Sequence, residues 1–277
     1  MSGRPIVSGA HIGGMDEPWS GGRIGERAFC VLAPNPSPMT LDGTNTWVLG
    51  SPDAGEVIVV DPGPEDDAHL DAVLAHINAQ GARVHATLLT HGHSDHSAAA
   101  RRWHERTGAP VLALDPQHRY GSEGLSEGDY LRAGDLAVEV VATPGHTQDS
   151  VCFVLADDRQ LLTGDTVLGR GTTVVAWPDG QLQAYLDSLH RLTDVIADQE
   201  SAVLLPGHGP ALHNTGAVVA DYLDHRHERL NQVRAAVAAG ATTAAEIVSI
   251  VYGDIPAAVR PAAQLSAQAQ LDYLNAG

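Results

Sequence analysis

The hexapeptide His91-Gly92-His93-Ser94-Asp95-His96 constrains this chain more than any other feature. It places four potential metal ligands directly after an apolar run over 84–90 and before a helical pattern over about 95–107. Alternate side chains of an extended segment point the same way, so His91 and His93 can face one ion. The chain then turns into the helix, where Asp95 and His96 project to a neighbouring point. Zinc accepts imidazole and carboxylate ligands, so the motif predicts a metal site at a strand end.

Three later residues supply further ligands of the same kinds. His146, Asp165 and His208 each stand beside a glycine, after predicted strands at 136–142, 159–163 and 201–205. Each short motif alone is typical of a turn. Together, and in this order, they indicate loops that converge on one centre with the hexapeptide.

Alternating patterns divide residues 28–215 into two similar halves. Strands are predicted at 28–33, 45–50, 56–61, 84–90, 110–114, 136–142, 150–155, 159–163 and 201–205, with helices at 65–80, 95–107 and 181–192. Strands followed by helices in each half predict two sheets packed face to face with helices outside, a four-layer α/β arrangement.

The two ends of the chain differ from this pattern. Residues 1–27 are rich in glycine and are expected to form a flexible arm. Residues 216–277 are predicted to form a small helical domain, with helices over 216–239 and 244–251 and a third opened by Pro256. Thr243 and Glu246 have the spacing of a capping box at the start of the second helix.

Charge and apolar content exclude several classes of protein. The formal net charge is −18, and a uniformly acidic surface repels phosphate backbones, which argues against non-specific nucleic-acid binding. The N-terminus lacks a basic segment followed by an apolar one, and no apolar run approaches membrane length. We expect a cytoplasmic protein without membrane contact, with Cys30 and Cys152 as buried thiols. Oligomeric state does not follow from these features.

The seven ligand-type residues together resemble those of the metallo-β-lactamase superfamily across residues 28–215. The stretches 43–50, 163–173 and 205–210 resemble its lactamase-β-like branch, which includes an animal endoribonuclease and carries a C-terminal winged helix. Residues 225–252 resemble that appendage, so 216–277 is expected to be winged-helix-like. Thr147-Gln148-Asp149 departs from the Thr-Pro-Gly of many relatives.

The resemblance implies an αββα sandwich and a binuclear centre, with zinc as the expected metal. By the resemblance, His91, His93 and His146 hold the first ion, while Asp95, His96 and His208 hold the second, and Asp165 bridges both.

Such a pair of ions, about 3.5–4 Å apart, can share a water and ionise it to a hydroxide that attacks a carbonyl or phosphoryl centre. Asp95 is expected to accept the proton as the intermediate collapses. Asp61, at the end of a predicted strand, is expected to orient an imidazole from behind, although an Asp-Pro turn explains it equally well. Ser94 is expected to be a helix N-cap rather than a nucleophile.

Four functions remain open from the sequence. We favour hydrolysis of a small acyl compound, such as a thioester, ester or lactone. Cleavage of single-stranded RNA is the alternative, with Arg101, Arg102 and Arg106 as its basic strip. Residues 216–277 hold four arginines and six acids, a net charge of −2, which favours a packing role for them over a phosphate clamp.

The other two functions fit the ligand set less well. A mononuclear iron oxygenase would use His91, His146 and Asp165 alone and leave Asp95, His96 and His208 without a role. A non-catalytic binding module would be expected to have lost a ligand, and none is missing.

Overall fold

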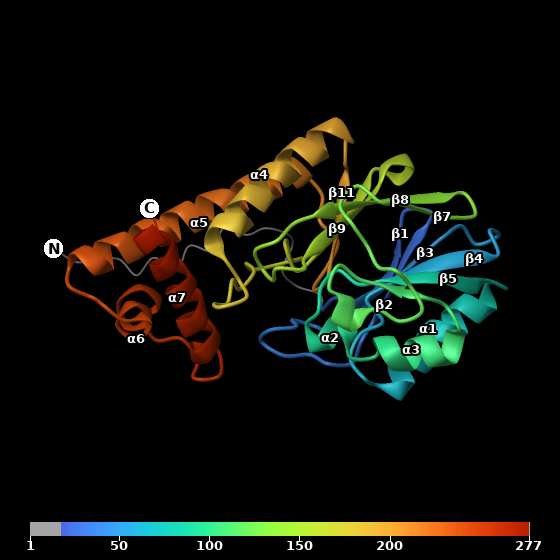
Figure 1. The fold of residues 1–277 in the computed structure, drawn as a ribbon, viewed down its shortest axis with the longest axis horizontal. Helices are drawn as coiled ribbons and strands as arrows, with labels where there is room; N and C mark the ends of the chain where they lie inside the picture. The colour runs from blue at the N-terminus through green and yellow to red at the C-terminus, as the bar shows by residue number, and fades with distance from the viewer. Residues whose placement is uncertain (1–17, 277) are drawn as a thin grey trace.

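Two mixed sheets form the body of the molecule in a computed structural model that describes residues 18–276 (Figure 1). The first sheet runs in the order β1 Gly22–Ile24, β2 Ala28–Leu32, β3 Asn45–Leu49, β4 Glu56–Val60, β5 Arg83–Leu88 and β6 Val111–Leu112. The second runs in the order β11 Val203–Pro206, β10 Gln160–Gly164, β9 Val151–Leu155, β8 Leu136–Ala142 and β7 Tyr130–Ala133. The pairs β4–β5, β5–β6 and β10–β11 are parallel, and the other neighbours are antiparallel.

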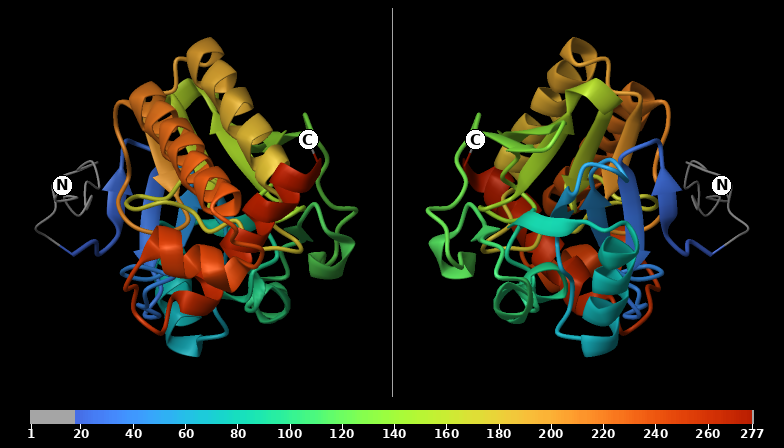
Figure 2. Two further views of the ribbon diagram at one scale, coloured as in Figure 1. Left: turned by 90° about the vertical axis from the view of Figure 1, so that its left-hand side faces the viewer. Right: turned by 90° about the vertical axis from the view of Figure 1, so that its right-hand side faces the viewer.

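The predicted four-layer arrangement is confirmed. Trp47 and Phe153 belong to a buried cluster between the two sheets. Helices α1 (Asp67–Ala79) and α3 (Ala100–Thr107) bury Leu70 and Trp103 against the first sheet. Helices α4 (Leu182–Asp198) and α5 (Thr215–Ala238) cover the second sheet with Tyr185 and Tyr222, and they lie side by side in both views of Figure 2.

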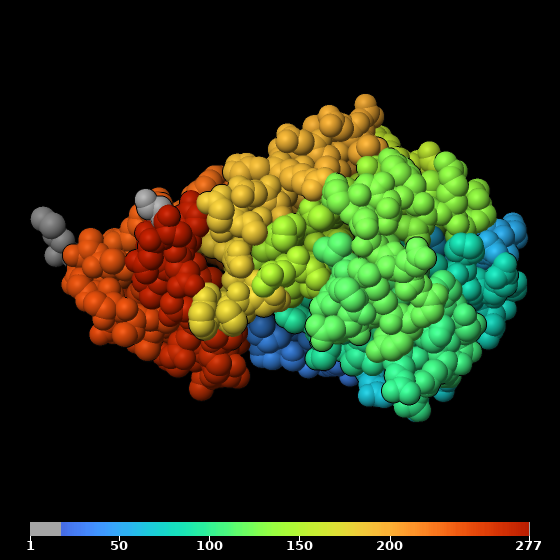
Figure 3. Space-filling model, in the orientation of Figure 1, coloured from blue at the N-terminus to red at the C-terminus, as the bar shows by residue number. Residues whose placement is uncertain are grey.

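The C-terminal helices form a lobe at one end of the molecule, orange and red in Figure 3. Helix α6 (Ala244–Ile247), a π-helical turn (Val248–Tyr252) and α7 (Arg260–Ala276) pack on the distal half of α5 around Val233 and Ile247. The capping box at the start of α6 is confirmed, since Thr243 Oγ1 accepts from the Glu246 backbone and the Glu246 carboxylate accepts from the Thr243 backbone. Residues 216–276 contain no strand, and therefore no wing hairpin.

Several predicted boundaries are wrong. Helix α7 begins at Arg260, so Pro261 rather than Pro256 stands in its first turn. The helix predicted over 95–107 is broken into α2 (Ser94–Ser97) and α3, and the N-cap of α2 is His93, with Ser94 as the first helical residue.

Two larger expectations also need correction. The flexible arm predicted over 1–27 does not hold for Gly22–Ile24, which pair with β2; residues 1–17 lie outside the described residues. The N-terminal half of α5 buries Val218 and Val219 in the sandwich, so this helix belongs to both predicted domains. Strand β7 was not predicted.

Within residues 18–276, no helix combines the length and apolar character that a membrane span requires.

The loops that carry the site lie at one edge of the sandwich. Asp61 follows β4, His91 follows β5, His146 follows β8, Asp165 follows β10 and His208 follows β11. The parallel pairs β4–β5 and β10–β11 each bring their carboxyl ends to the same edge, where ligand sites form in α/β folds.

Asn45 joins the two sheets at this edge. Its side-chain amide donates to Pro206 O at 2.9 Å and to Gly209 O at 2.8 Å, while its backbone N–H donates to Gly207 O at 2.8 Å. The side-chain oxygen Oδ1 of Asn45 accepts a hydrogen bond from Trp19 Nε1 at 2.7 Å. A fully buried side chain of the first sheet thus fixes the loop of the second that carries His208.

Replacing Asn45 with alanine should destabilise the protein by about 2–4 kcal/mol, because two buried carbonyls lose their donors. Urea unfolding followed by circular dichroism measures this loss. Asn231→Ala, at an exposed position on α5, is the matched control and should change stability by less than about 0.5 kcal/mol. Equal stability of the two variants would contradict this role for Asn45.

Candidate metal centre

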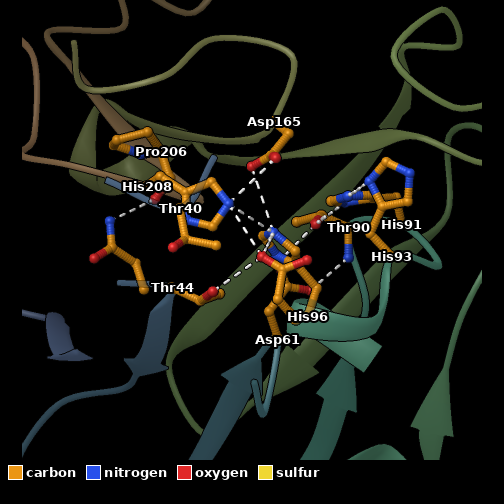
Figure 4. A network of polar contacts seen from close by, with 12 residues as sticks. Thr40, Thr44, Asp61, Thr90, His91, His93, His96, Asp165, Pro206 and His208 are labelled. Atoms are coloured by element: carbon orange, nitrogen blue, oxygen red, sulfur yellow. Dashed lines mark hydrogen bonds and ion pairs between the residues drawn. The ribbon is translucent and has the colours of Figure 1, made fainter. Parts of the chain in front are cut away.

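The structure brings together all seven side chains predicted as metal ligands. They form two clusters and a connecting one, in which ligand-type atoms lie within 4.8 Å of one another: His91, His93 and His146; Asp95, His96 and His208; and His91, His96 and Asp165. Figure 4 shows His96 and His208 directed toward Asp165, with Asp61 on the other side of His96. The first two clusters have the members that the family resemblance implies for the two ions, and Asp165 stands in the connecting one.

The first cluster consists of three imidazoles directed at one point. His93 Nδ1 lies 3.0 Å from His91 Nε2 and 3.0 Å from His146 Nε2. His146 Nδ1 lies 2.8 Å from Val174 O, and this carbonyl requires a proton on Nδ1. The Nε2 atom of His146 therefore presents a lone pair to the cluster.

The second cluster has the same construction with a carboxylate added. Asp95 Oδ2 lies 3.3 Å from His96 Nε2 and 3.2 Å from His208 Nε2, and the two Nε2 atoms are 3.3 Å apart. His208 Nδ1 donates to Gly43 O at 3.1 Å. Its proton is thereby placed on the far side of the ring.

Asp165 lies between the two clusters. Its Oδ1 is 3.5 Å from His96 Nε2, and its Oδ2 is 3.3 Å from His208 Nε2 and 3.7 Å from His146 Nε2. Oδ1 is buried without a hydrogen-bond partner among the described residues. Such an atom costs free energy unless a cation satisfies it.

These distances fit divalent cations. Ligand atoms about 2.0–2.2 Å from a shared tetrahedral ion lie about 3.3–3.6 Å from one another. The separations within the two clusters and to Asp165 run from 3.0 to 3.7 Å and so cover this spacing. Lone pairs directed at each other across such distances repel, and a cation between them reverses the sign of the interaction.

Burial and neighbouring charge set the protonation of these groups. Burial lowers the pKa of His146 to about 4 and that of His91 well below its usual value, which keeps both rings neutral as metal ligands must be. Burial opposes the charged form of His208 as well, but Asp165 and Asp95 raise its pKa to about 9. Burial would raise the pKa of Asp165, yet His208 and His96 hold it well below the usual range. A proton on His208 thus gives the second cluster the kind of positive charge that a metal ion would supply.

Asp61 contacts the second cluster from behind. Its Oδ2 accepts from His96 Nδ1 at 2.8 Å and from Thr90 Oγ1 at 2.7 Å, while Oδ1 accepts from Thr90 N at 2.8 Å. The residue is 1% exposed and has a φ of 53°, a region that side chains other than glycine rarely adopt. A simple Asp-Pro turn does not explain these contacts.

Glycine is required where Gly207 approaches the centre. A Cβ atom at this position would lie 2.4 Å from Asp165 Oδ1 and 2.8 Å from His96 Cε1. The glycine next to His208 in the sequence therefore lets the backbone approach the centre closely.

Thr44 and Thr90 contact the ligands although neither was predicted as a site residue. Thr44 Oγ1 donates to Asp95 Oδ2 at 3.0 Å, and Thr90 Oγ1 lies 3.0 Å from His91 Nδ1. The polar residues 44–46, at the start of the predicted strand 45–50, are the signal available for Thr44. Thr90 carried none beyond its place before His91.

Helices α4 and α5 hold the segment that follows Asp165. Tyr185 Oη donates to Thr166 O at 2.7 Å, and Tyr222 Oη accepts from Leu168 N at 2.9 Å. Both tyrosines are buried. The outer helix layer therefore fixes the conformation of a metal-site loop.

Arg226 of α5 adds a third contact to this segment. Its guanidinium donates to Thr173 O and lies over the ring of Tyr185 at 4.9 Å. Thr173 Oγ1 in turn donates to Asp165 O at 2.7 Å. Arg226 is 6% exposed, and no carboxylate among the described residues pairs with it, so the carbonyl and the aromatic ring are its main compensation.

Two hollows adjoin the clusters. One of about 170 Å³ is lined by Pro38, Met39, Leu41, His146, Asp165, Leu168, Arg170, Gly171, Thr172, Thr173 and Val174. The other, of about 340 Å³, is lined by Gly92, His93, Asp115, His118, Thr147, Gln148, Asp149 and Asp179. A larger hollow of about 640 Å³ lies between the start of α4 and the end of α7 and contains none of the seven residues.

Comparison with known families agrees with this geometry. The family model described as the metallo-beta-lactamase superfamily matches residues 39–208, and that of the beta-lactamase associated winged helix domain matches residues 243–276. The chain is 31% identical to an atrochrysone carboxyl ACP thioesterase of Aspergillus chevalieri, over 84% of this chain and 76% of that protein. It is 31% identical to a beta-lactamase-like protein 2 homolog of Caenorhabditis elegans, over 87% of this chain and 81% of that protein.

Solved structures show the same fold. A beta-lactamase domain protein from Burkholderia ambifaria superposes with a TM-score of 0.77 at 24% identity, covering 92% of this chain and 88% of the other. A metallo-beta-lactamase family protein from Thermus thermophilus gives 0.75 at 23% identity, covering 90% and 93%.

Asp61→Asn should weaken metal binding about tenfold or more, because the amide cannot hold the His96 ring as a carboxylate does. Competition with a chromophoric chelator measures the affinity. Asp71→Asn, an exposed surface change, should bind metal as the natural protein does. Unchanged affinity of the Asp61 variant would remove this residue from the site.

Arg226→Met should lower the free energy of unfolding by about 1–3 kcal/mol, because Thr173 O loses its buried donor. Thermal and urea unfolding report the change. Arg234→Met, at an exposed position of the same helix, is the matched control, because it removes the same charge without removing a buried contact. If the two variants unfold alike, Arg226 does not support the loop.

Proposed function

Because the chain belongs to the metallo-beta-lactamase superfamily, we propose that it is a binuclear zinc hydrolase that cleaves a small acyl substrate, a thioester foremost. The observation that carries this proposal is the pair of ligand clusters with Asp165 between them. The relatives titled as thioesterases support the substrate class.

Each cluster would hold one ion. His91, His93 and His146 would hold the first, Asp95, His96 and His208 the second, and Asp165 both. Divalent ions in these places supply Lewis acidity, which lowers the pKa of water and polarises a carbonyl oxygen. His96 and His208 are kept in orientation by Asp61 and by Gly43 O, so their Nε2 atoms need no rearrangement to act as ligands.

Asp95 is suited to move a proton during hydrolysis. Its side chain is 26% exposed, against 11% for Asp165, so it is the carboxylate of the centre that substrate and water reach most easily. In thioester cleavage the water oxygen bonds to the acyl carbon and the carbon–sulfur bond breaks. Asp95 takes the proton of the water and passes it to the thiolate, leaving a carboxylic acid and a thiol.

The hollow of about 170 Å³ beside His146 and Asp165 suits the acyl group. Met39, Leu41 and Leu168 form an apolar wall beside His146 and Asp165. A carbonyl placed at the ligand clusters would extend its chain along this wall, away from water. Pro38, in the proline-rich segment 34–38, also lines this hollow.

The surface disfavours RNA as the substrate. The expected basic strip is neutralised, because Arg101, Arg102 and Arg106 pair with Glu105, Asp67 and Asp71 respectively. The hollow of about 340 Å³ beside His93 is lined by Asp115, Asp149 and Asp179, which repel phosphate. The mononuclear iron alternative would leave the cluster of Asp95, His96 and His208 unused.

Metal removal tests the proposal directly. Dialysis against a chelator should lower thioester turnover at least about a hundredfold, since several kcal/mol of transition-state stabilisation are lost, and added zinc should restore it. Thiol release is followed by a colorimetric reagent, and a lactone, a chromogenic β-lactam and a short RNA are compared in the same panel.

Undiminished turnover in the stripped protein would refute the metal-dependent mechanism. Metal-dependent RNA fragments without thiol release would favour the endoribonuclease instead. Metal analysis of the purified protein gives the number and identity of the ions independently of activity.

A further inference from the structure

Arg170 stands out in the hollow that adjoins the ligand clusters. It is the one arginine among the residues lining the two hollows beside the clusters, and the chain contains no lysine. The second hollow has three aspartates instead. In a protein of formal net charge −18, this guanidinium marks the place where an anion can approach the centre.

Asp42 orients Arg170 without using all of its donors. Arg170 Nη2 lies 2.6 Å from Asp42 Oδ2, and the two side chains are 34% and 16% exposed. A guanidinium has five N–H donors in a fixed fork, and this ion pair involves only Nη2. Among the described residues Asp42 is its only ion-pair partner, so further donors are left for a ligand.

The surroundings of Arg170 restrict what the ligand can be. The hollow of about 170 Å³ is lined by this one cation and by the metal-ligand candidates His146 and Asp165. An apolar wall that includes Leu168 completes the lining. The volume is smaller than that of pockets for drug-sized ligands, about 300–1,000 Å³. A matching group is therefore short, apolar in the middle and anionic at its far end.

We propose that Arg170 binds a carboxylate at the distal end of the acyl group, which makes the preferred substrates monothioesters of short dicarboxylic acids. This inference rests on the proposed hydrolase function. Carboxylate is chosen over phosphate because the hollow, at about 170 Å³, is small, and a guanidinium fork can bind a carboxylate through two parallel hydrogen bonds.

A matched pair of substrates tests the proposal. Glutaryl and valeryl thioesters of N-acetylcysteamine share a chain length and a neutral thiol, and they differ in the terminal carboxylate. The natural protein should prefer the glutaryl compound in kcat/KM. Arg170→Gln should reduce that preference about tenfold or more, mainly through KM, because a charge-assisted hydrogen bond is lost, and Arg170→Lys should retain part of it.

Two further variants separate binding from a structural role. Asp42→Asn removes the ion pair but keeps the cation, so the preference for the glutaryl compound should persist. Arg159→Gln, at an arginine of an exposed turn that pairs with Glu200, should behave as the natural protein. If Arg170→Gln and Asp42→Asn slow both substrates by equal factors, the pair only fastens two loops and the proposal is wrong.

Binding without turnover distinguishes failure of this inference from failure of the function. Calorimetry with glutarate on the metal-loaded protein should show an affinity that Arg170→Gln weakens about tenfold or more, and valerate should bind both proteins alike. Hydrolysis of the valeryl thioester reports the proposed function separately. Equal glutarate affinity of the two proteins would overturn the carboxylate site even if both thioesters are cleaved.

Discussion

Mutual compensation of buried charge at the edge of the two sheets is the constraint on which the rest of this structure depends. Five imidazoles and the carboxylates of Asp61, Asp95 and Asp165 converge there, and most of them are almost without solvent contact. Burial opposes the charged form of six of these groups, so their charges depend on one another: His91, His96, His146, His208, Asp95 and Asp165. The pKa directions divide the centre: burial keeps His91 and His146 neutral, while Asp165 and Asp95 raise the pKa of His208, so that the second cluster holds positive charge. The same arrangement suits divalent cations.

The scaffold serves this centre by fixing loops from both sheets. Asn45 of the first sheet binds the carbonyls around His208, and Arg226 of α5 binds the segment after Asp165. These contacts explain why α5 cannot be assigned to an appendage alone. One half of the helix completes the outer layer of the sandwich and supports the metal-site loop, while the other half forms the base of the C-terminal lobe.

The two hollows beside the ligand clusters differ in the charge and polarity of their lining residues. On one side of His93 the lining is acidic, with Asp115, Asp149 and Asp179. On the side of Asp165 it is apolar with Arg170 at its margin. A substrate that places its carbonyl between the two hollows experiences opposite fields at its two ends, which is a property of the lining residues rather than of the ligand set. Relatives with the same ligands can therefore differ in substrate through these linings alone.

The sequence by itself determined the ligand types, their order and the four-layer fold, because strand periodicity and the residues at strand ends are local properties of the chain. It also determined the capping box of Thr243 and Glu246, which spans one helical turn. Strand β7 escaped detection because this edge strand lacks an apolar run and carries the exposed Tyr130. Only the tertiary structure decided which groups orient the ligands. Gly43 O, Val174 O and Arg226 are backbone carbonyls or distant side chains, and no local pattern distinguishes a carbonyl that meets an imidazole from one that does not.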